Sequence, residues 1–107
     1  MAAAPKARVV VLGAGWWTQG WHLPHLRRHA DAEIIAIVDP CANPRSAIST
    51  LKPLKELGVK YDCATFASFD ACLDSGLEFD GVIVCTSHAS HSQLGAQALA
   101  QGKHVLM

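Results

Sequence analysis

Two glycines separated by one alanine follow an apolar run near the start of the chain. The run R-V-V-V-L (residues 8–12) leads directly into Gly13-Ala14-Gly15. Gly13 permits a tight turn, and Gly15 lets a pyrophosphate approach backbone N–H groups at the beginning of a helix, where the helix dipole favours negative charge. Thr18 stands where the dinucleotide-binding fingerprint has its third glycine, so we expect the helix to lie slightly farther from the strand.

An acidic residue ends the second apolar run of the chain. Asp39 closes I-I-A-I-V-D and follows Gly15 at close to the offset of about 20 residues expected for a carboxylate that accepts ribose hydroxyls. A carboxylate there repels a 2′-phosphate and favours NAD, while Arg45 offers a phosphate contact if its loop folds back, which leaves NADP possible. In the alternative interpretation, Asp39 is only a turn residue before Pro40.

A polar loop follows the apolar run G-V-I-V-C-T (residues 81–86). Its residues lie at the carboxyl edge of the expected sheet, where ligands bind in open α/β folds. The candidate cofactor-binding residues here are Thr86, Ser87, His88 and His91. We expect His88 and His91 to contact the nicotinamide ribose or the substrate, unless one of them merely caps the following helix.

Three tryptophans lie within the six positions after the glycines. Trp17 is expected on the inner side of the turn, in the core, whereas Trp16 and Trp21 either pack or line the cofactor cleft. Trp16 and Trp17 are both included among the candidate cofactor-binding residues.

Neither the histidines nor the cysteines indicate a metal site. His22, His25 and His29 have a spacing that lines one face of a straight helix, but Pro24 interrupts that helix and its face. The four cysteines include no C-x-x-C pair, and we expect them to be reduced and mostly buried.

The segments that must position these residues alternate between strand and helix signals. The β-branched runs at 8–12, 34–38 and 81–86 are typical of strands buried on both faces of a parallel sheet, and weaker strands are expected at 59–64 and 104–107. Helices are expected after Gly15, from Asn43-Pro44 to Gly58 with a break near Lys52 at Pro53, from Ser68 to Gly76, and from Ser90 to Gly102.

This alternation predicts an α/β fold with a doubly wound, Rossmann-like parallel sheet of about five strands. We expect a disordered tail over residues 1–7 and a single dinucleotide-binding domain over residues 8–107. The 107 residues are 50% hydrophobic with a formal net charge of zero, which disfavours nucleic acid as a partner, and no apolar run is long enough for a membrane span. A cytoplasmic protein is therefore expected.

Several stretches together resemble a known family. They are G-A-G-W-W, H-L-P-H-L, I-V-D-P, D-G-V-I-V-C-T-S-H-A-S-H and A-L-A-Q-G-K-H-V-L-M. From residue 8 onward the chain resembles the N-terminal domain of the Gfo/Idh/MocA oxidoreductases, the group of glucose-fructose oxidoreductase and inositol dehydrogenase. The resemblance implies a Rossmann domain that binds NAD or NADP, with hydride transfer at a sugar or cyclitol carbon. The matching positions are Gly13, Gly15, Asp39, Thr86 and His91.

The chain departs from the family pattern at three places. Thr18 replaces the third glycine, and Ser87 replaces the proline that commonly follows the threonine. The sequence stops at Met107, where the family has E-K-P, whose lysine hydrogen-bonds the reacting hydroxyl, and Lys103 is expected at the opposite edge of the sheet. The domain is thus incomplete at its C-terminus by comparison, and we expect cofactor binding without turnover and possible homo-oligomers of a full-length form.

Two other interpretations stay open at this point. One is a nucleotide-sensing or interaction module without catalysis. The other is a fragment of an S-adenosylmethionine-dependent methyltransferase, although such loops usually carry an acid just before the first glycine, where this chain has Leu12.

Overall fold

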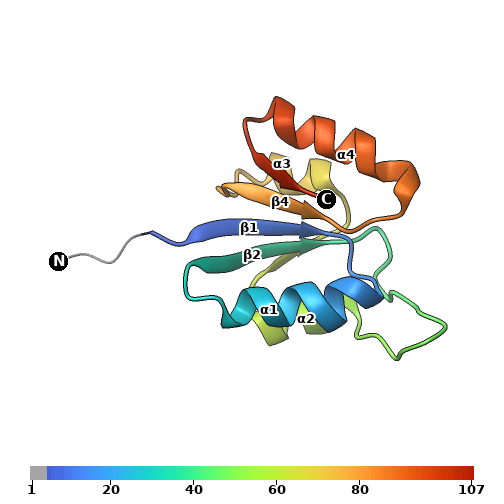
Figure 1. Cartoon of the computed structure of the whole chain (residues 1–107). Coiled ribbons are helices and arrows are strands. Elements are labelled where there is room, and N and C mark those ends of the chain that lie inside the picture. The colour runs from blue at the N-terminus through green and yellow to red at the C-terminus, as the bar shows by residue number, and fades with distance from the viewer. Residues whose placement is uncertain (1–4) are drawn as a thin grey trace.

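The computed structural model describes residues 5–107 and contains one sheet of five parallel strands in the order β3-β2-β1-β4-β5 (Figure 1). The strands are β1 (Ala7–Leu12), β2 (Ala32–Val38), β3 (Ala64–Phe66), β4 (Gly81–Val84) and β5 (His104–Leu106). The helices are η1 (Thr18–His22), α1 (Leu23–Arg28), α2 (Leu54–Tyr61), α3 (Phe69–Asp74) and α4 (His88–Ala100). The predicted α/β fold with a Rossmann-like parallel sheet is confirmed.

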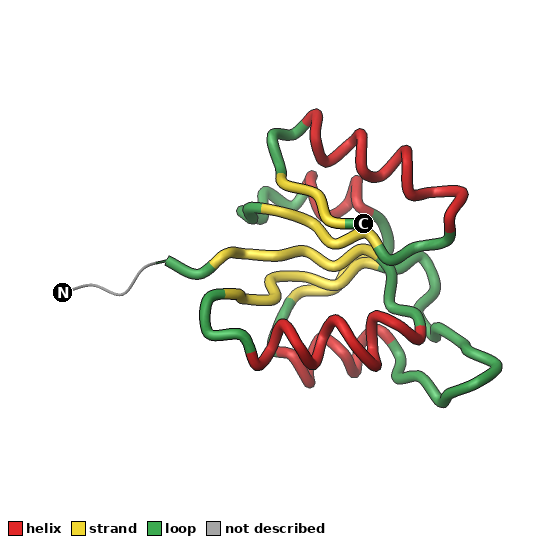
Figure 2. The backbone as a smooth tube through the Cα atoms, in the orientation of Figure 1, coloured by secondary structure: helices red, strands yellow, loops and turns green. Residues whose placement is uncertain are grey.

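Helices cover both faces of the sheet, with α1 and α2 on one side and α3 and α4 on the other (Figure 2). Successive residues of β1 pack alternately against the two helix layers, because side chains alternate across a strand. Val10 and Leu12 pack in the cluster that contains Phe69 of α3, whereas Val11 packs in the cluster that contains Leu23 of α1. This double burial explains why the central strands are continuous apolar runs.

The strand expected at 59–64 is wrong in its position. Val59 lies in α2, and the strand that follows is β3, which begins at Ala64. The helix extends further than expected because Leu57 and Tyr61 are buried on its inner face, and it ends at Asp62, whose φ of 50° is left-handed.

Gly58 lies inside α2 and does not end it. A β-carbon at this position would lie 2.9 Å from Cγ2 of Thr65, so the glycine lets the helix pack closely on the neighbouring strand β3.

The helix start expected at Asn43-Pro44 is also wrong. Residues 43–53 form a loop, and α2 begins at Leu54 with Pro53 at its N-cap. The expected break at Pro53 is therefore present, but it is the beginning of the helix, which suits a residue without a backbone N–H.

The other two helix starts show one success and one error. Ser68 caps α3 as expected, since its Oγ accepts a hydrogen bond from Ala71 N at 3.1 Å. Ser90 does not cap α4, because the N-cap is Ser87 and Ser90 lies in the first turn.

The first helix is irregular just before Pro24. Residues 18–22 form a single π turn, in which Leu23 N donates to the Thr18 carbonyl, and α1 continues directly from it. Residues 1–4 of the expected N-terminal tail lie outside the described residues, and Ala7 is already the first residue of β1.

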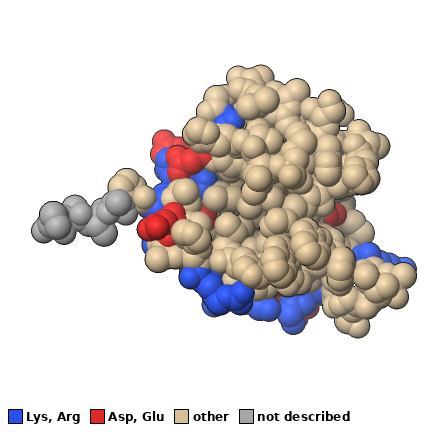
Figure 3. Space-filling view, in the orientation of Figure 1, with Lys and Arg blue, Asp and Glu red and all other residues tan. Residues whose placement is uncertain are grey.

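An ion pair ties β1 to the residue just before β4. Asp80 Oδ2 accepts hydrogen bonds from Arg8 N at 2.7 Å and Arg8 Nε at 3.4 Å, and Asp80 Oδ1 lies 3.2 Å from Arg8 Nη2. Charged side chains of both signs gather at this edge, beside the N-terminus (Figure 3). The side chain and backbone hydrogen bonds from Arg8 lower the pKa of the Asp80 carboxyl.

This pair predicts part of the acid sensitivity of the fold. A carboxyl whose pKa is lower in the folded state stabilises it above the unfolded pKa of about 4, and this contribution is lost as the pH falls through the folded value. We expect Asp80→Asn to lower stability at pH 7 and to flatten its decline at acid pH, measured by urea unfolding between pH 7 and pH 2. Glu78→Gln is the control, because the Glu78 side chain is 84% exposed and should matter little. An equal effect of both variants would contradict the assignment.

Candidate functional site

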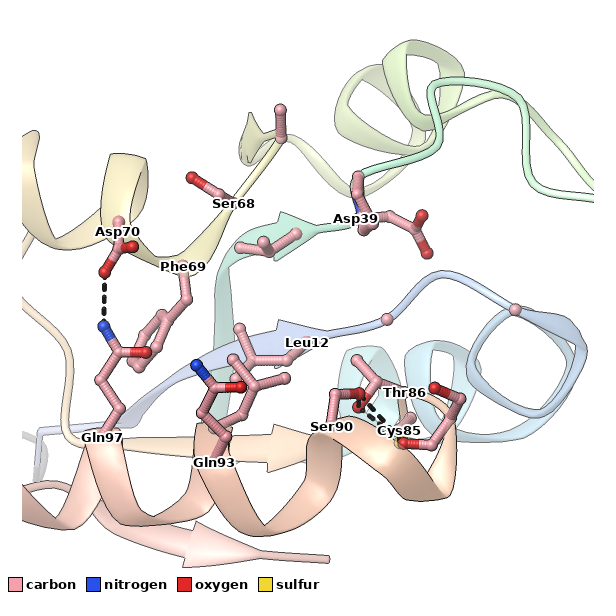
Figure 4. A pocket seen from close by; sticks show the side chains of 17 residues that line it. Leu12, Asp39, Ser68, Phe69, Asp70, Cys85, Thr86, Ser90, Gln93 and Gln97 are labelled. Carbon is pink, nitrogen blue, oxygen red and sulfur yellow. Dashed lines mark hydrogen bonds between the residues drawn. The ribbon is translucent and has the colours of Figure 1, made fainter.

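A cavity of about 510 Å³ opens at the carboxyl ends of β1, β2 and β4. The strand order reverses between β1 and β4 at this point, and open α/β sheets bind their ligands in such a crevice. Figure 4 shows Asp39 at the end of β2, Thr86 and Ser90 after β4, and Gln93 on α4 around this first cavity. Its walls come from the glycine turn, the ends of β2 and β4, the beginning of α3, and one face of α4 as far as Gln97.

Gly13 forms the tight turn that the sequence predicted, at the closest backbone approach of the site. Its φ is +101°, and a β-carbon there would lie 2.6 Å from the Cys85 carbonyl oxygen. Its N–H donates to the Val38 carbonyl at 2.7 Å. Only glycine satisfies both the backbone conformation and the lack of space.

Gly15 differs from Gly13, because the protein itself leaves room for a side chain there. Its φ is not positive, and a β-carbon would meet no atom within 4 Å. Gly15 lines the first cavity, so the space that a side chain would fill is space available to a ligand.

Asp39 fixes the glycine turn through its carboxylate. Its Oδ2 accepts a hydrogen bond from Ala14 N at 2.7 Å, and its Oδ1 accepts one from Cys41 N at 2.8 Å. The bond to Cys41 N fits the alternative interpretation of Asp39 as a turn residue before Pro40. Asp39 therefore stabilises its own turn and also faces the cavity.

The loop after β4 is organised by side chains of α4. Ser90 Oγ donates to Thr86 Oγ1 at 2.7 Å, and His91 Nε2–H donates to the Thr86 carbonyl at 2.6 Å. Thr86 and Ser87 line the first cavity as predicted candidates. His88 is exposed and does not line the first cavity, and its ring centroid lies 5.3 Å from that of His91.

Sequence reasoning missed a polar stripe along α4. Ser90, Gln93 and Gln97 line the first cavity at i, i+3 and i+7, and Gln97 Nε2 donates to Asp70 Oδ1 of α3 (Figure 4). The helical spacing of these polar residues was the available signal, since residues three and four apart share a helix face.

The structure corrects the placement of Trp17, which was expected in the core. Trp17 is 49% exposed, and its ring stacks on that of Trp21 at a centroid distance of 5.2 Å. Thr18 and Leu23 are the residues that this helix buries, which leaves Trp17 on the outer side. Trp16 and Trp21 are exposed to a similar degree, and neither lines the first cavity.

A second cavity of about 440 Å³ lies on the other side of the end of β4. Trp17 and His22 form one wall and His91 another, and its remaining lining residues are Ile83, Val84, Cys85, Thr86, Leu106 and Met107. Burial lowers the pKa of His22, with a smaller effect from His25, so the His22 imidazole is neutral at pH 7.

Thr18 is buried at the position of the third glycine, with 1% of its surface exposed. Its hydroxyl has no hydrogen bond of normal geometry within residues 5–107, and its polar neighbour is the weakly bonding thiol of Cys85. Burial raises the pKa of Cys85, and the neighbouring Thr18 hydroxyl lowers it by less, so the thiol is protonated at neutral pH.

Lys103 lies away from both cavities. Its Nζ donates to the Phe79 carbonyl at 2.8 Å and sits 4.4 Å from the centroid of the Phe79 ring. Since it precedes β5, it belongs to the amino edge of the sheet, as expected from the sequence.

A parallel sheet with a glycine turn after β1 and a carboxylate at the end of β2 is typical of nucleotide-binding Rossmann domains. The family model described as "Oxidoreductase family, NAD-binding Rossmann fold" matches residues 7–107. The chain therefore belongs to the Gfo/Idh/MocA oxidoreductase family, and the methyltransferase interpretation has no support.

Two relatives and one solved structure with the same fold are similar to this chain. A protein of Amycolatopsis mediterranei (strain S699), provisionally named a UDP-kanosamine synthase oxidoreductase subunit, is 30% identical over 95% of this chain and 25% of its own length. A provisionally assigned dehydrogenase structure from Bordetella bronchiseptica RB50 is 26% identical with a TM-score of 0.77, covering 94% of this chain and 24% of that one. KijD10, a 3-ketoreductase from Actinomadura kijaniata in complex with NADP and TDP-benzene, is 24% identical with a TM-score of 0.77, covering 94% and 28%.

The chain spans about a quarter of the length of these relatives. Within residues 5–107, no helix has the length and apolar character needed to cross a membrane.

The contrast between two glycines tests the geometry of the turn. Gly13→Ala should destabilise the fold by at least about 2 kcal/mol, because alanine is strained at this φ and overlaps the Cys85 carbonyl. Gly20→Ala is the matched control: Gly20 is helical and exposed with open space around it, so alanine should leave stability unchanged or raise it by up to about 1 kcal/mol. Urea unfolding measures both, and similar behaviour of the two variants would refute the assigned constraint at Gly13.

Proposed function

We propose that this chain binds a nicotinamide dinucleotide across its two cavities, as the cofactor domain of an oxidoreductase that acts on a sugar or cyclitol alcohol. The observation that carries the proposal is that the two cavities are adjacent. The first and second cavities share Cys85 and Thr86, and Gly13 and Gly15 line the first cavity beside these residues. A dinucleotide has two lobes joined by a pyrophosphate, and this arrangement offers two compartments that meet at the end of β4, beside a glycine turn.

The residues present fit each part of that cofactor. The open space at Gly15 suits a pyrophosphate beside the backbone N–H groups that begin the first helix. Asp39 faces the first cavity, where its carboxylate can accept ribose hydroxyls. When bound, the nicotinamide supplies the carbon that gives or receives hydride.

The nicotinamide end belongs in the second cavity under this proposal. Trp17 offers an aromatic wall there, and His91 keeps the Thr86 peptide in place through its Nε2–H. Of the remaining candidates, Ser87 is assigned to the first cavity, and Trp16 and His88 keep only a role at the rim, since they line neither cavity.

NAD is preferred over NADP in this assignment. The first cavity is lined by two carboxylates, Asp39 and Asp70, and its described lining residues include no Lys or Arg that would pair with a 2′-phosphate. Arg45 is exposed on the loop after β2 and does not line the cavity. The family description names NAD, whereas the KijD10 complex contains NADP, so cofactor choice in relatives varies.

The names of similar proteins support the proposed substrate class. The provisional name of the Amycolatopsis protein refers to a nucleotide-linked amino sugar, and KijD10 is a 3-ketoreductase crystallised with a TDP derivative. We extend this to an alcohol or ketone carbon of a sugar ring, placed against the nicotinamide in the second cavity.

A binding titration tests the cofactor assignment. Calorimetry with NAD, NADP and S-adenosylmethionine should show binding of NAD, weaker binding of NADP and none of the methyl donor. Gly15→Val should weaken NAD binding more than about tenfold, because the side chain fills the space assigned to the pyrophosphate, while the unfolding midpoint changes little. Gly20→Val is the control for a valine in the same helical region and should bind NAD normally.

Asp39→Asn separates the charge of Asp39 from its shape. Asparagine keeps one side-chain oxygen as an acceptor, so NAD binding should fall severalfold while NADP gains relative to NAD. Failure of the parent chain to bind NAD at millimolar concentration, or binding of S-adenosylmethionine alone, would refute the proposed function.

A further inference from the structure

The Gln19 side chain joins two segments that are far apart in the sequence. Its Nε2 donates hydrogen bonds to the Ala14 carbonyl at 2.9 Å and to the Lys52 carbonyl at 3.0 Å. Its Oε1 accepts a hydrogen bond from Lys52 N at 2.8 Å. One amide group therefore connects the glycine turn to the end of the loop between β2 and α2.

This loop, residues 42–53, projects beside the beginning of the first helix (Figure 1). Leu54 N donates to the Ala42 carbonyl at 2.8 Å, and this bond joins the two ends of the loop at its base. The Gln19 amide adds two hydrogen bonds to Lys52 at the same base of the loop, on the side that faces the glycine turn.

The Ala14 residue between the two glycines is fixed from both sides. Its N–H donates to Asp39 Oδ2, and its carbonyl accepts from Gln19 Nε2. Asp39 lies just before the loop, and Lys52 lies near the end of the loop. The turn and both ends of the loop thus form one hydrogen-bonded unit.

We infer that Gln19 is a positioning residue, which orients the pyrophosphate-binding turn and couples that turn to the order of loop 42–53. The inference rests on the proposed dinucleotide binding. Gln19 would touch no cofactor atom itself, because it lines neither cavity and acts through Ala14 and Lys52.

The chemistry of the amide explains why glutamine suits this position. The three bonds use both N–H groups and the oxygen of the side chain, and only an amide offers two donors and an acceptor on one planar group. Glutamate keeps the acceptor for Lys52 N but sets a carboxylate against two carbonyl oxygens. Methionine has a similar length and makes none of the three bonds.

The first test compares ligands with and without a pyrophosphate. Gln19→Met and Gln19→Glu should each weaken binding of ADP and NAD about tenfold, because the turn loses its orientation. Binding of adenosine, which needs only the first cavity, should change less than about threefold. Gln101→Met is the matched control, since Gln101 is exposed after α4 and its side chain makes no hydrogen bond within the described residues.

The second test measures how readily trypsin cuts the loop. Arg45 is exposed in the loop and is followed by Ser46, so trypsin can cut there, whereas Lys52 precedes proline and resists cleavage. ADP should slow cleavage after Arg45 in the parent chain. In both Gln19 variants the same bond should be cut faster without ligand, and ADP should no longer slow it. Cleavage after Lys6, ahead of β1, is the internal reference.

The outcomes separate this inference from the proposed function. If the parent chain binds no ADP or NAD, the proposed function fails, and the cleavage rates without ligand still decide whether Gln19 secures the loop. If the parent chain binds but both variants match it in ADP affinity and in cleavage, Gln19 has no positioning role. An equal loss for adenosine and ADP would also overturn the inference, because it would indicate a general structural defect.

Discussion

The close contact between Gly13 and the Cys85 carbonyl determines how the ligand edge of this sheet is built. The backbone leaving β1 passes so near the end of β4 that no side chain fits between them. Cys85 N donates to the Leu12 carbonyl, and Gly13 N donates to the Val38 carbonyl, each at 2.7 Å. The ends of β4, β1 and β2 are therefore joined at one point, and the chain must turn there with a positive φ.

This joint orients the peptide that follows it. With Gly13 fixed, the N–H of Ala14 faces the Asp39 carboxylate and its carbonyl faces the Gln19 amide. The first cavity is bounded by this turn and, among its described lining residues, has no basic side chain. An anionic group there would be stabilised by backbone N–H groups and the dipole of the first helix, which makes the orientation of the turn more important than any single charge.

The sequence was sufficient wherever the determinants are local. β1, β2 and β4 were predicted to within two residues at each end, because strands buried on both faces leave continuous β-branched runs, and the turn and Asp39 follow those runs at fixed positions. The boundaries of α2 and β3 were missed, since the length of α2 depends on how Leu57 and Tyr61 pack on the sheet. The hydrogen bonds between Gln19 and Lys52 could not be predicted either, because Lys52 lies 33 positions away in the sequence.

Trp17 shows a different limit of sequence reasoning. A tryptophan beside a glycine turn is usually packed, but in this helix Thr18 and Leu23 are the residues that face the sheet. Thr18 is buried in its place, with a hydroxyl that lacks a good partner within the described residues, and Trp17 becomes a wall of the second cavity. A buried polar group of this kind opposes stability, which is typical of sites where function and packing compete.

The Asp39 carboxylate can hold the turn and bind a ligand at the same time, because it can accept several hydrogen bonds. Its two oxygens offer about four acceptor sites. Two are used by the N–H groups of Ala14 and Cys41, and these bonds keep the group in place without a ligand. The two remaining sites match the two hydroxyls of the adenosine ribose in the proposed cofactor. A 2′-phosphate would remove one of those donors and bring negative charge to the carboxylate, so under the proposed function the two remaining acceptor sites of Asp39 favour NAD over NADP.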